Sequence, residues 1–245
     1  MENIMSEDYE VLKENMRIRL EKVKAEIHEA LVMSGRSEDS LTLIGVSKHF
    51  PAKNARAAYE LGLCDLGENR VQELLSKEEE LNNMGVDPDW HMIGTLQTNK
   101  VRMIVGHTKL IHSVSSEELI LEIQKRSLAK AIKTSILLQV NISQEVSKHG
   151  FDAEQMERVV ELAGQCSNIT LCGLMTMAPI QTFEHEARSV FEKTYDLFSR
   201  LGNQVREPQL WSDISMGMSQ DYIDAIQCGA THIRIGSAIF GQRNY

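Results

Sequence analysis

A chain of 245 residues is longer than the ~100 to 150 residues of a typical domain, but it is short enough to form one large domain. Hydrophobic residues make up 42% of the chain and charged residues 25%, which argues against wholesale disorder, collagen-like repeats and a coiled-coil rod. The net charge of −9, with no dense basic run, argues against nucleic-acid binding because the phosphate backbone would be repelled.

The first predicted element is a long helix between residues 9 and 34. Apolar side chains recur there at intervals of three and four and line one face: Leu12, Met16, Leu20, Val23, Ile27 and Leu31. Gly35 ends the pattern. The rhythm also fits a coiled coil, but it is too short for one, so a helix packed on the body of the protein is favoured. Residues 1–35 are therefore treated as an added N-terminal helix.

From residue 41 onward, short apolar runs alternate with longer amphipathic stretches, the pattern of repeated βα units. Eight runs are predicted as strands: 42–47, 63–66, 89–93, 110–114, 135–140, 170–175, 210–213 and 231–235. The stretches between them are predicted as helices: 52–61, 71–84, 98–105, 117–131, 153–165, 184–201 and 221–228. Eight strands alternating with helices, in a chain close to the ~250 residues of that fold, predict a closed (β/α)8 TIM barrel.

An open doubly wound sheet is the alternative architecture, since it also alternates strands and helices. Such a sheet normally carries a glycine-rich fingerprint directly after its first strand, whereas residues 47–51 here read SKHFP. No linker rich in Pro, Gly or Ser and no shift in composition marks a domain boundary. Residues 1–245 are therefore predicted to form a single domain.

The four cysteines, Cys64, Cys166, Cys172 and Cys228, stand apart in the sequence. None belongs to a C-x-x-C pair or to a Cys/His cluster with metal-ligand spacing, so no metal site is predicted and the thiols are expected to be reduced and in the core. No segment approaches the ~20 consecutive apolar residues of a membrane span. A soluble, cytoplasmic protein is expected.

Barrel proteins place their chemistry at the C-terminal ends of the strands. Lys48 directly follows the first predicted strand, on the same face as Ile44 and Val46. A lysine in a barrel mouth can act as the neutral amine that attacks an aldehyde, although a solvated lysine is the alternative. Asn69, after the second strand, either caps the next helix or contacts a ligand. His91, in the third strand, is either a core histidine or a ligand contact.

Two loops near the C-terminus combine glycine with serine. Residues 215–219 read SMGMS and residues 234–238 read RIGSA, and each loop leads into a predicted helix. The loops after strands seven and eight form the recurrent phosphate site of TIM barrels, where glycine lets the backbone approach and free N–H groups bind the anion. Simple helix capping is the alternative for Ser219 and for Ser237. The presence of Gly and Ser in both loops favours a phosphorylated ligand.

Arg234 lies between Ile233 and Ile235 near the end of the last predicted strand. Because the two isoleucines suit the layer between strands and helices, the guanidinium is predicted to point into the barrel. An inward guanidinium needs an acceptor, which is either an inward carboxylate or a ligand.

Six motifs in this order resemble the pyridoxal phosphate homeostasis protein family: VSK at 46–48, GEN at 67–69, WHMIG at 90–94, GLMTM at 173–177, SMGMS at 215–219 and RIG at 234–236. The resemblance extends over almost the whole chain, to Phe240 and Gly241. It implies a TIM barrel of the alanine racemase type that stands alone and binds pyridoxal 5′-phosphate (PLP). It also implies a role as an intracellular carrier or buffer of vitamin B6.

The resemblance further implies how the cofactor is held. Lys48 would form a Schiff base with PLP, and Arg234 would contact the pyridine nitrogen. Ser219, Gly236 and Ser237 would hold the phosphate group.

Other positions have less direct roles in the family pattern. Asn69 would stand near the ring, with His91 and Met218 as pocket neighbours. Lys148 matches a lysine that is considered a secondary acceptor of PLP. The chain departs from some relatives at Phe50, where they carry a second lysine, which puts only accessory lysine chemistry in doubt.

The predicted function is therefore a non-catalytic, monomeric PLP carrier, with PLP-dependent apo-enzymes as recipients. Two enzyme functions remain as alternatives. An amino-acid racemase would need a second base, which the racemase resemblance assigns to a tyrosine of a separate β-domain, and the chain is expected to lack that domain because it ends at Tyr245. A Schiff-base aldolase acting on a phosphorylated substrate would need Lys48 free of PLP. Arg234 beside the ring nitrogen disfavours ring protonation, which weakens carbanion chemistry and favours the carrier.

Overall fold

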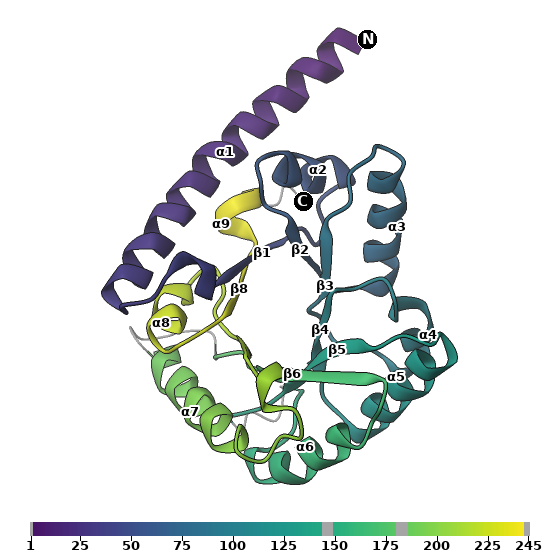
Figure 1. Ribbon diagram of the computed structural model, residues 1–245. Coiled ribbons are helices and arrows are strands. Elements are labelled where there is room, and N and C mark those ends of the chain that lie inside the picture. Colours follow the sequence, from purple (N-terminus) through teal and green to yellow (C-terminus); the bar gives the residue numbers. More distant parts are fainter. Residues whose placement is uncertain (1, 144–148, 180–185, 243–245) are drawn as a thin grey trace.

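The fold is a closed ring of parallel strands, seen end-on in Figure 1. The computed structural model describes residues 2–143, 149–179 and 186–242. The strands pair in chain order, and β1 pairs with β8 to close the ring. Their bounds are β1 (Thr42–Val46), β2 (Asp65–Glu68), β3 (Asp89–Met92), β4 (Leu110–Val114), β5 (Thr134–Gln139), β6 (Ile169–Met175), β7 (Asp213–Ser215) and β8 (His232–Ile235). The predicted TIM barrel is confirmed.

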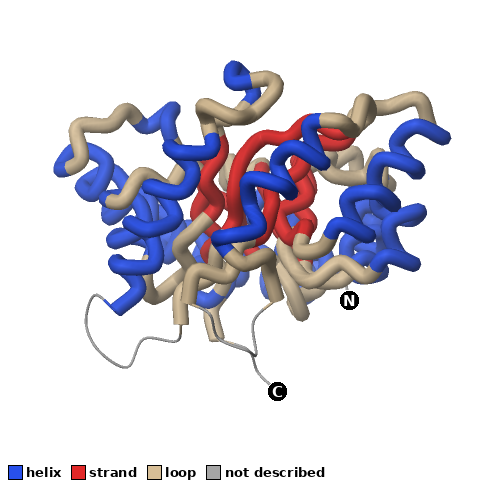
Figure 2. The backbone as a smooth tube through the Cα atoms, turned by 90° about the horizontal axis from the view of Figure 1, so that it is seen from below, coloured by secondary structure: helices blue, strands red, loops and turns tan. Residues whose placement is uncertain are grey.

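Helices surround this ring, so that strands occupy the centre and helices the outside (Figure 2). Parallel strands covered in this way are apolar on the face toward the helices. The α-helices of the ring are α2 (Ala52–Glu60), α3 (Val71–Asn82), α4 (Val101–Ile104), α5 (Glu117–Ala129), α6 (Met156–Gly164), α7 (Glu186–Leu201), α8 (Tyr222–Gln227) and α9 (Ser237–Phe240). Short 3-10 turns are η1 (Glu38–Ser40), η2 (Thr98–Lys100), η3 (Ala153–Gln155) and η4 (Pro208–Leu210).

Two strands lie further along the chain than the apolar runs predict. The second strand was expected at 63–66, but Leu63 packs against Gly45 from the helix side, and pairing with β3 begins at Asp65. The seventh was expected at 210–213, but η4 ends at Leu210 and pairing with β6 begins at Asp213. In both cases the strand contains polar residues that a hydrophobic run does not reveal.

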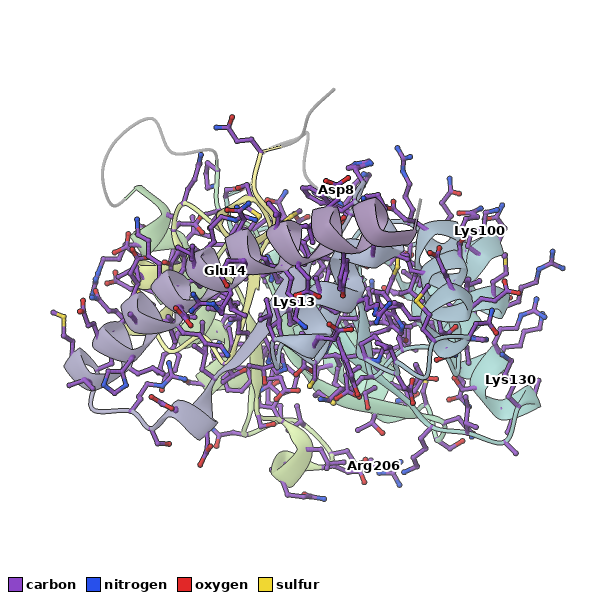
Figure 3. The ribbon with its side chains drawn as sticks, turned by 90° about the horizontal axis from the view of Figure 1, so that it is seen from above. Asp8, Lys13, Glu14, Lys100, Lys130 and Arg206 are labelled. Carbon is purple, nitrogen blue, oxygen red and sulfur yellow. The ribbon has the colours of Figure 1, made fainter. Side chains whose placement is uncertain are left out.

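The long N-terminal helix α1 (Glu2–Met33) lies along one side of the barrel, as predicted, and its N-terminal end extends beyond α2 (Figure 1). Figure 3 shows it crossing the body with Lys13 and Glu14 along its length. Lys13 pairs with Glu60 of α2 at 2.6 Å, and Arg19 Nε donates to the carbonyl of Ile239 at 2.7 Å. In the described part of the chain, no helix is both long and apolar enough to cross a membrane.

The four cysteines are all free thiols. Cys166 and Cys228 are buried and Cys172 is half-buried, as expected for core thiols. The prediction is wrong for Cys64, which is exposed and lies directly before β2.

Candidate functional site

A cavity of about 390 Å³ lies where the C-terminal ends of the strands converge. Residues that follow β1, β2, β3, β6, β7 and β8 contribute to its walls, together with Gln139 at the end of β5. Seven of the predicted site residues line it: Lys48, Asn69, Met218, Ser219, Arg234, Gly236 and Ser237. Sequence positions almost 190 residues apart are therefore brought into one cavity. Lys148 lies outside the described residues.

Lys48 enters this cavity from the turn directly after β1. The register places Ile44 of β1 beside Arg234 of β8, so the lysine and the arginine come from neighbouring strands. The lysine side chain is half-buried, and Val46 lies beside it in the same wall. An amine and a guanidinium thus share one wall of the cavity.

The loops after β7 and β8 are joined to each other. The Gly236 N–H donates to Ser219 Oγ at 3.3 Å, and the Met218 N–H donates to Asp221 Oδ1 at 2.6 Å. Gly217 has φ of +95°, and a Cβ there would lie 2.6 Å from the Ala225 side chain, so only glycine allows the loop to approach α8 this closely. The two loops form one wall with serine hydroxyls on it, as a phosphate group requires.

Asn69 is held against the loop after β3. A Cβ added at Gly94 would lie 2.4 Å from the Asn69 carbonyl oxygen, so this position also requires glycine. Both Gly94 and Asn69 line the cavity. The close backbone approach therefore places the Asn69 side chain at the cavity wall rather than on the surface of α3.

Arg234 is the most buried cation of the site, with an exposed fraction of 5%. Its guanidinium donates to Ser215 Oγ at 2.5 Å and to the Thr176 carbonyl at 3.0 Å. Burial lowers the pKa of Arg234 to about 10, while the nearby Asp221 acts to raise it. The group therefore remains charged at neutral pH, and the cavity wall holds a fixed cation.

Behind Arg234, a chain of hydrogen bonds crosses the inside of the barrel. Ser215 Oγ lies 2.8 Å from His112 Nδ1, His112 Nε2 lies 2.9 Å from His91 Nδ1, and His91 Nε2 lies 2.9 Å from Asp65 Oδ1. Because β4 and β7 are not neighbours in the ring, the bond from His112 to Ser215 must cross the interior. Asp65 also accepts a bond from Lys109 Nζ at 2.9 Å.

The direction of this chain follows from its two ends. Arginine can only donate, so Ser215 Oγ accepts from Arg234, and its own O–H is available to donate to His112 Nδ1. Burial lowers the pKa of His112 well below its usual range, so that ring carries one proton, on Nε2, which it donates to His91. His91 then donates from Nε2 to Asp65, a carboxylate whose pKa is lowered by its bonds to His91 and Lys109 although burial acts to raise it.

His91 therefore departs from the sequence prediction. Its ring is completely buried, is not among the described residues that line the cavity, and turns toward Asp65 at the N-terminal end of β2. The interpretation as a core histidine describes it better than a pocket neighbour. His112 is not among the predicted site residues, although it is a lone histidine inside the apolar run 110–114.

Comparison with known proteins gives the class to which this barrel belongs. The family described as "Alanine racemase, N-terminal domain" matches residues 24–244. A solved alanine racemase of Clostridium difficile 630 has the same fold, with a TM-score of 0.70 at 16% identity, covering 95% of this chain and 58% of that chain. The chain is thus a TIM-barrel protein of the alanine racemase N-terminal domain family.

More similar relatives define the family more narrowly. A pyridoxal phosphate homeostasis protein of Aquifex aeolicus is 40% identical, with 93% of this chain and 98% of the relative covered. The structure of PipY from Synechococcus elongatus PCC7942 with PLP bound has a TM-score of 0.76 at 34% identity and covers 88% of this chain and 100% of that one. The chain belongs to the pyridoxal phosphate homeostasis protein family.

Proposed function

We propose that this protein binds PLP and takes part in intracellular vitamin B6 homeostasis as a carrier or buffer. The observation that carries the proposal is the single cavity that gathers Lys48, Arg234 and the joined loops at Ser219 and Gly236. The PLP bound to the relative PipY supports it. When bound, PLP supplies an aldehyde that condenses with an amine.

The residues of the cavity fit the three parts of this cofactor. Lys48 would supply the amine for condensation with the aldehyde, with release of water. Arg234 offers a charged donor to the unprotonated ring nitrogen. Ser219, Gly236 and Ser237 offer hydroxyl and N–H donors to the phosphate. Asn69 and Met218, which line the same cavity, would lie near the ring.

The wider role is part of the same proposal. The protein acts in the cytoplasm as a monomer, holds PLP without catalysing its reactions, and passes it to PLP-dependent apo-enzymes. Arg234 stays protonated, which supports a non-catalytic role. A pyridine nitrogen that accepts a hydrogen bond from a guanidinium stays unprotonated, and an unprotonated PLP ring withdraws electrons only weakly.

Replacing Lys48 with alanine tests the covalent link. We expect Lys48→Ala to lose the visible absorbance of the C=N bond while the protein stays folded. The Lys48 side chain is half-buried at the barrel mouth, so its truncation removes no volume from the hydrophobic core. The measurement is an absorption spectrum with PLP, followed by borohydride reduction and mapping of the modified lysine. Lys53→Ala, an exposed lysine on α2, is the control. Modification mainly at another lysine in the wild-type protein would contradict the assignment.

The phosphate wall gives a separate test. Ser219→Ala should weaken PLP binding by about 1 to 3 kcal/mol, the usual cost of removing a hydrogen-bond partner from a charged group. It should also free the Gly236 N–H, which now donates to Ser219 Oγ. Equilibrium titration of PLP into the apo-protein measures the change, with Ser212→Ala, an exposed serine before β7, as the control. An unchanged affinity for PLP would show that Ser219 joins the two loops but does not bind the phosphate.

A further inference from the structure

The turn that carries Lys48 is held from both sides. The Phe50 N–H donates to the Ser47 carbonyl at 3.0 Å, which closes a four-residue turn with Lys48 second and His49 third. His49 has φ of +67°. A positive φ at the third position is the mark of a type II turn, where glycine or asparagine is usual.

This backbone conformation is costly for histidine. The left-handed region is disfavoured for a residue with a Cβ, and such residues persist only where their surroundings hold them. One such contact is the bond from the His49 N–H to Glu73 Oε1 of α3, at 2.5 Å. The residue after Lys48 is thus fixed by a carboxylate from the neighbouring helix.

A buried lysine connects that carboxylate to the residue before Lys48. Lys77 Nζ donates to the Ser47 carbonyl at 2.8 Å, to Glu68 Oε1 at 2.6 Å and to Glu73 Oε1 at 3.0 Å. An ammonium has three protons to donate, and all three are used here. Ser47 in addition donates from Oγ to Glu68 Oε1 at 2.6 Å.

This cluster is not what stability alone would select. Glu68 is completely buried, and its Oε2 has no hydrogen-bond partner among the described residues. Burial raises the pKa of Glu68 although Lys77 acts to lower it. Replacing such a buried ion pair with apolar side chains is often neutral or stabilising. Apolar side chains in these positions could not make the hydrogen bonds to Ser47 and His49.

We propose that Glu68, Glu73 and Lys77 are positioning residues that fix the direction in which Lys48 enters the cavity. They hold Ser47 and His49, the two residues that flank Lys48. The inference rests on the proposed function, since it concerns how readily Lys48 meets the PLP aldehyde. The reaction itself stays the same: amine and aldehyde give a C=N bond and water.

Glu73 is the best position for a test, because its side chain is 22% exposed and its loss leaves no buried hole. Glu73→Ala removes the acceptor of the His49 N–H, while Glu73→Gln keeps an oxygen in its place. Glu78→Ala is the matched control: it lies on the same helix and loses a comparable 2.7 Å contact, to His107, which is not part of the Lys48 turn. Thermal unfolding of each variant checks that the fold is retained.

Two ligands distinguish a loss of Lys48 orientation from a general loss of ligand binding. PLP carries the aldehyde, whereas pyridoxine 5′-phosphate has the same ring and phosphate but cannot form the C=N bond. We expect Glu73→Ala to slow the appearance of the C=N absorbance about tenfold, as for the loss of one hydrogen bond to a charged acceptor. Pyridoxine 5′-phosphate should bind as in the wild type. Glu73→Gln should recover most of the rate, and Glu78→Ala should keep all of it.

A second variant tests the role of the turn directly. Glycine adopts a positive φ without strain, so His49→Gly added to Glu73→Ala should recover part of the lost rate. The inference is overturned if Glu73→Ala reacts at the wild-type rate, if both ligands weaken equally, if glutamine behaves as alanine, or if glycine at position 49 rescues nothing. A wild-type protein that forms no C=N bond with PLP would overturn the proposed function and this inference together.

Discussion

Acidification from pH 7.5 to pH 5 is expected to destabilise the folded protein through two histidines inside the barrel. Burial lowers the pKa of His112 well below its usual range, and it lowers the pKa of His232 to about 3. In the unfolded chain both rings take up a proton near pH 6.5. Between pH 6.5 and about pH 3, these two histidines therefore bind more protons in the unfolded state than in the folded state. Their contribution to the free energy of unfolding decreases as the pH falls.

The expected size is large for single side chains. At pH 5, His232 alone would account for a loss of about 2 kcal/mol relative to pH 7.5, and His112 would add to it. The buried carboxyls Glu68, Asp213 and Asp221 act in the opposite direction, because burial raises their pKa values and the folded state then binds their protons first. The histidine contribution must therefore be measured by difference.

Urea unfolding between pH 7.5 and pH 4.5, in wild type and in His232→Asn, provides that difference. The variant should show a shallower dependence of the unfolding free energy on pH. His28→Gln is the control, since His28 is an exposed residue of α1 paired with Glu38. Parallel curves for wild type and His232→Asn would show that His232 is protonated in the folded protein at the same pH as in the unfolded chain.

The barrel itself could be predicted from sequence because its strands and helices alternate with clear periodicity. The errors fall where strands contain polar groups that are paired inside the fold. Asp65 opens β2 because His91 and Lys109 pair with it, and Ser215 ends β7 because His112 and Arg234 bond to it. A hydrophobic run cannot reveal such residues, since their burial depends on partners far away in the chain.

The cavity residues were predictable for a related reason. Lys48 and Gly236 closely follow β1 and β8, and Ser219 lies in the loop after β7, so their positions direct them to the barrel mouth. The residues that contact Ser47 and His49 could not be predicted from the sequence. Lys77 and Glu73 have the spacing of charged residues on the solvent-exposed face of a helix. Only the packing of α3 against the ends of β1 and β2 brings them to Ser47 and His49.

Replacing Arg234 with glutamate is expected to destabilise the folded protein by roughly 3 to 5 kcal/mol, the range for breaking a buried charged interaction. The arginine donates to the Thr176 carbonyl and to Ser215 Oγ, and Asp221 is its nearby negative charge. A carboxylate in its place would meet the carbonyl without a proton to share and would repel Asp221. Arg234→Gln, which keeps amide donors, should cost less, about 1 to 3 kcal/mol.

The glutamate variant should also reverse the hydrogen-bond chain through the barrel. Ser215 would give its proton to the new carboxylate, so His112 would donate to Ser215 from Nδ1 instead of accepting there. His112 Nε2 would then accept from His91 Nδ1. Urea unfolding measures the first effect, and ¹⁵N NMR of the imidazole rings measures the second by reporting the tautomer of His112. If Arg234→Glu had wild-type stability and an unchanged His112 tautomer, Arg234 would not determine the direction of this hydrogen-bond chain.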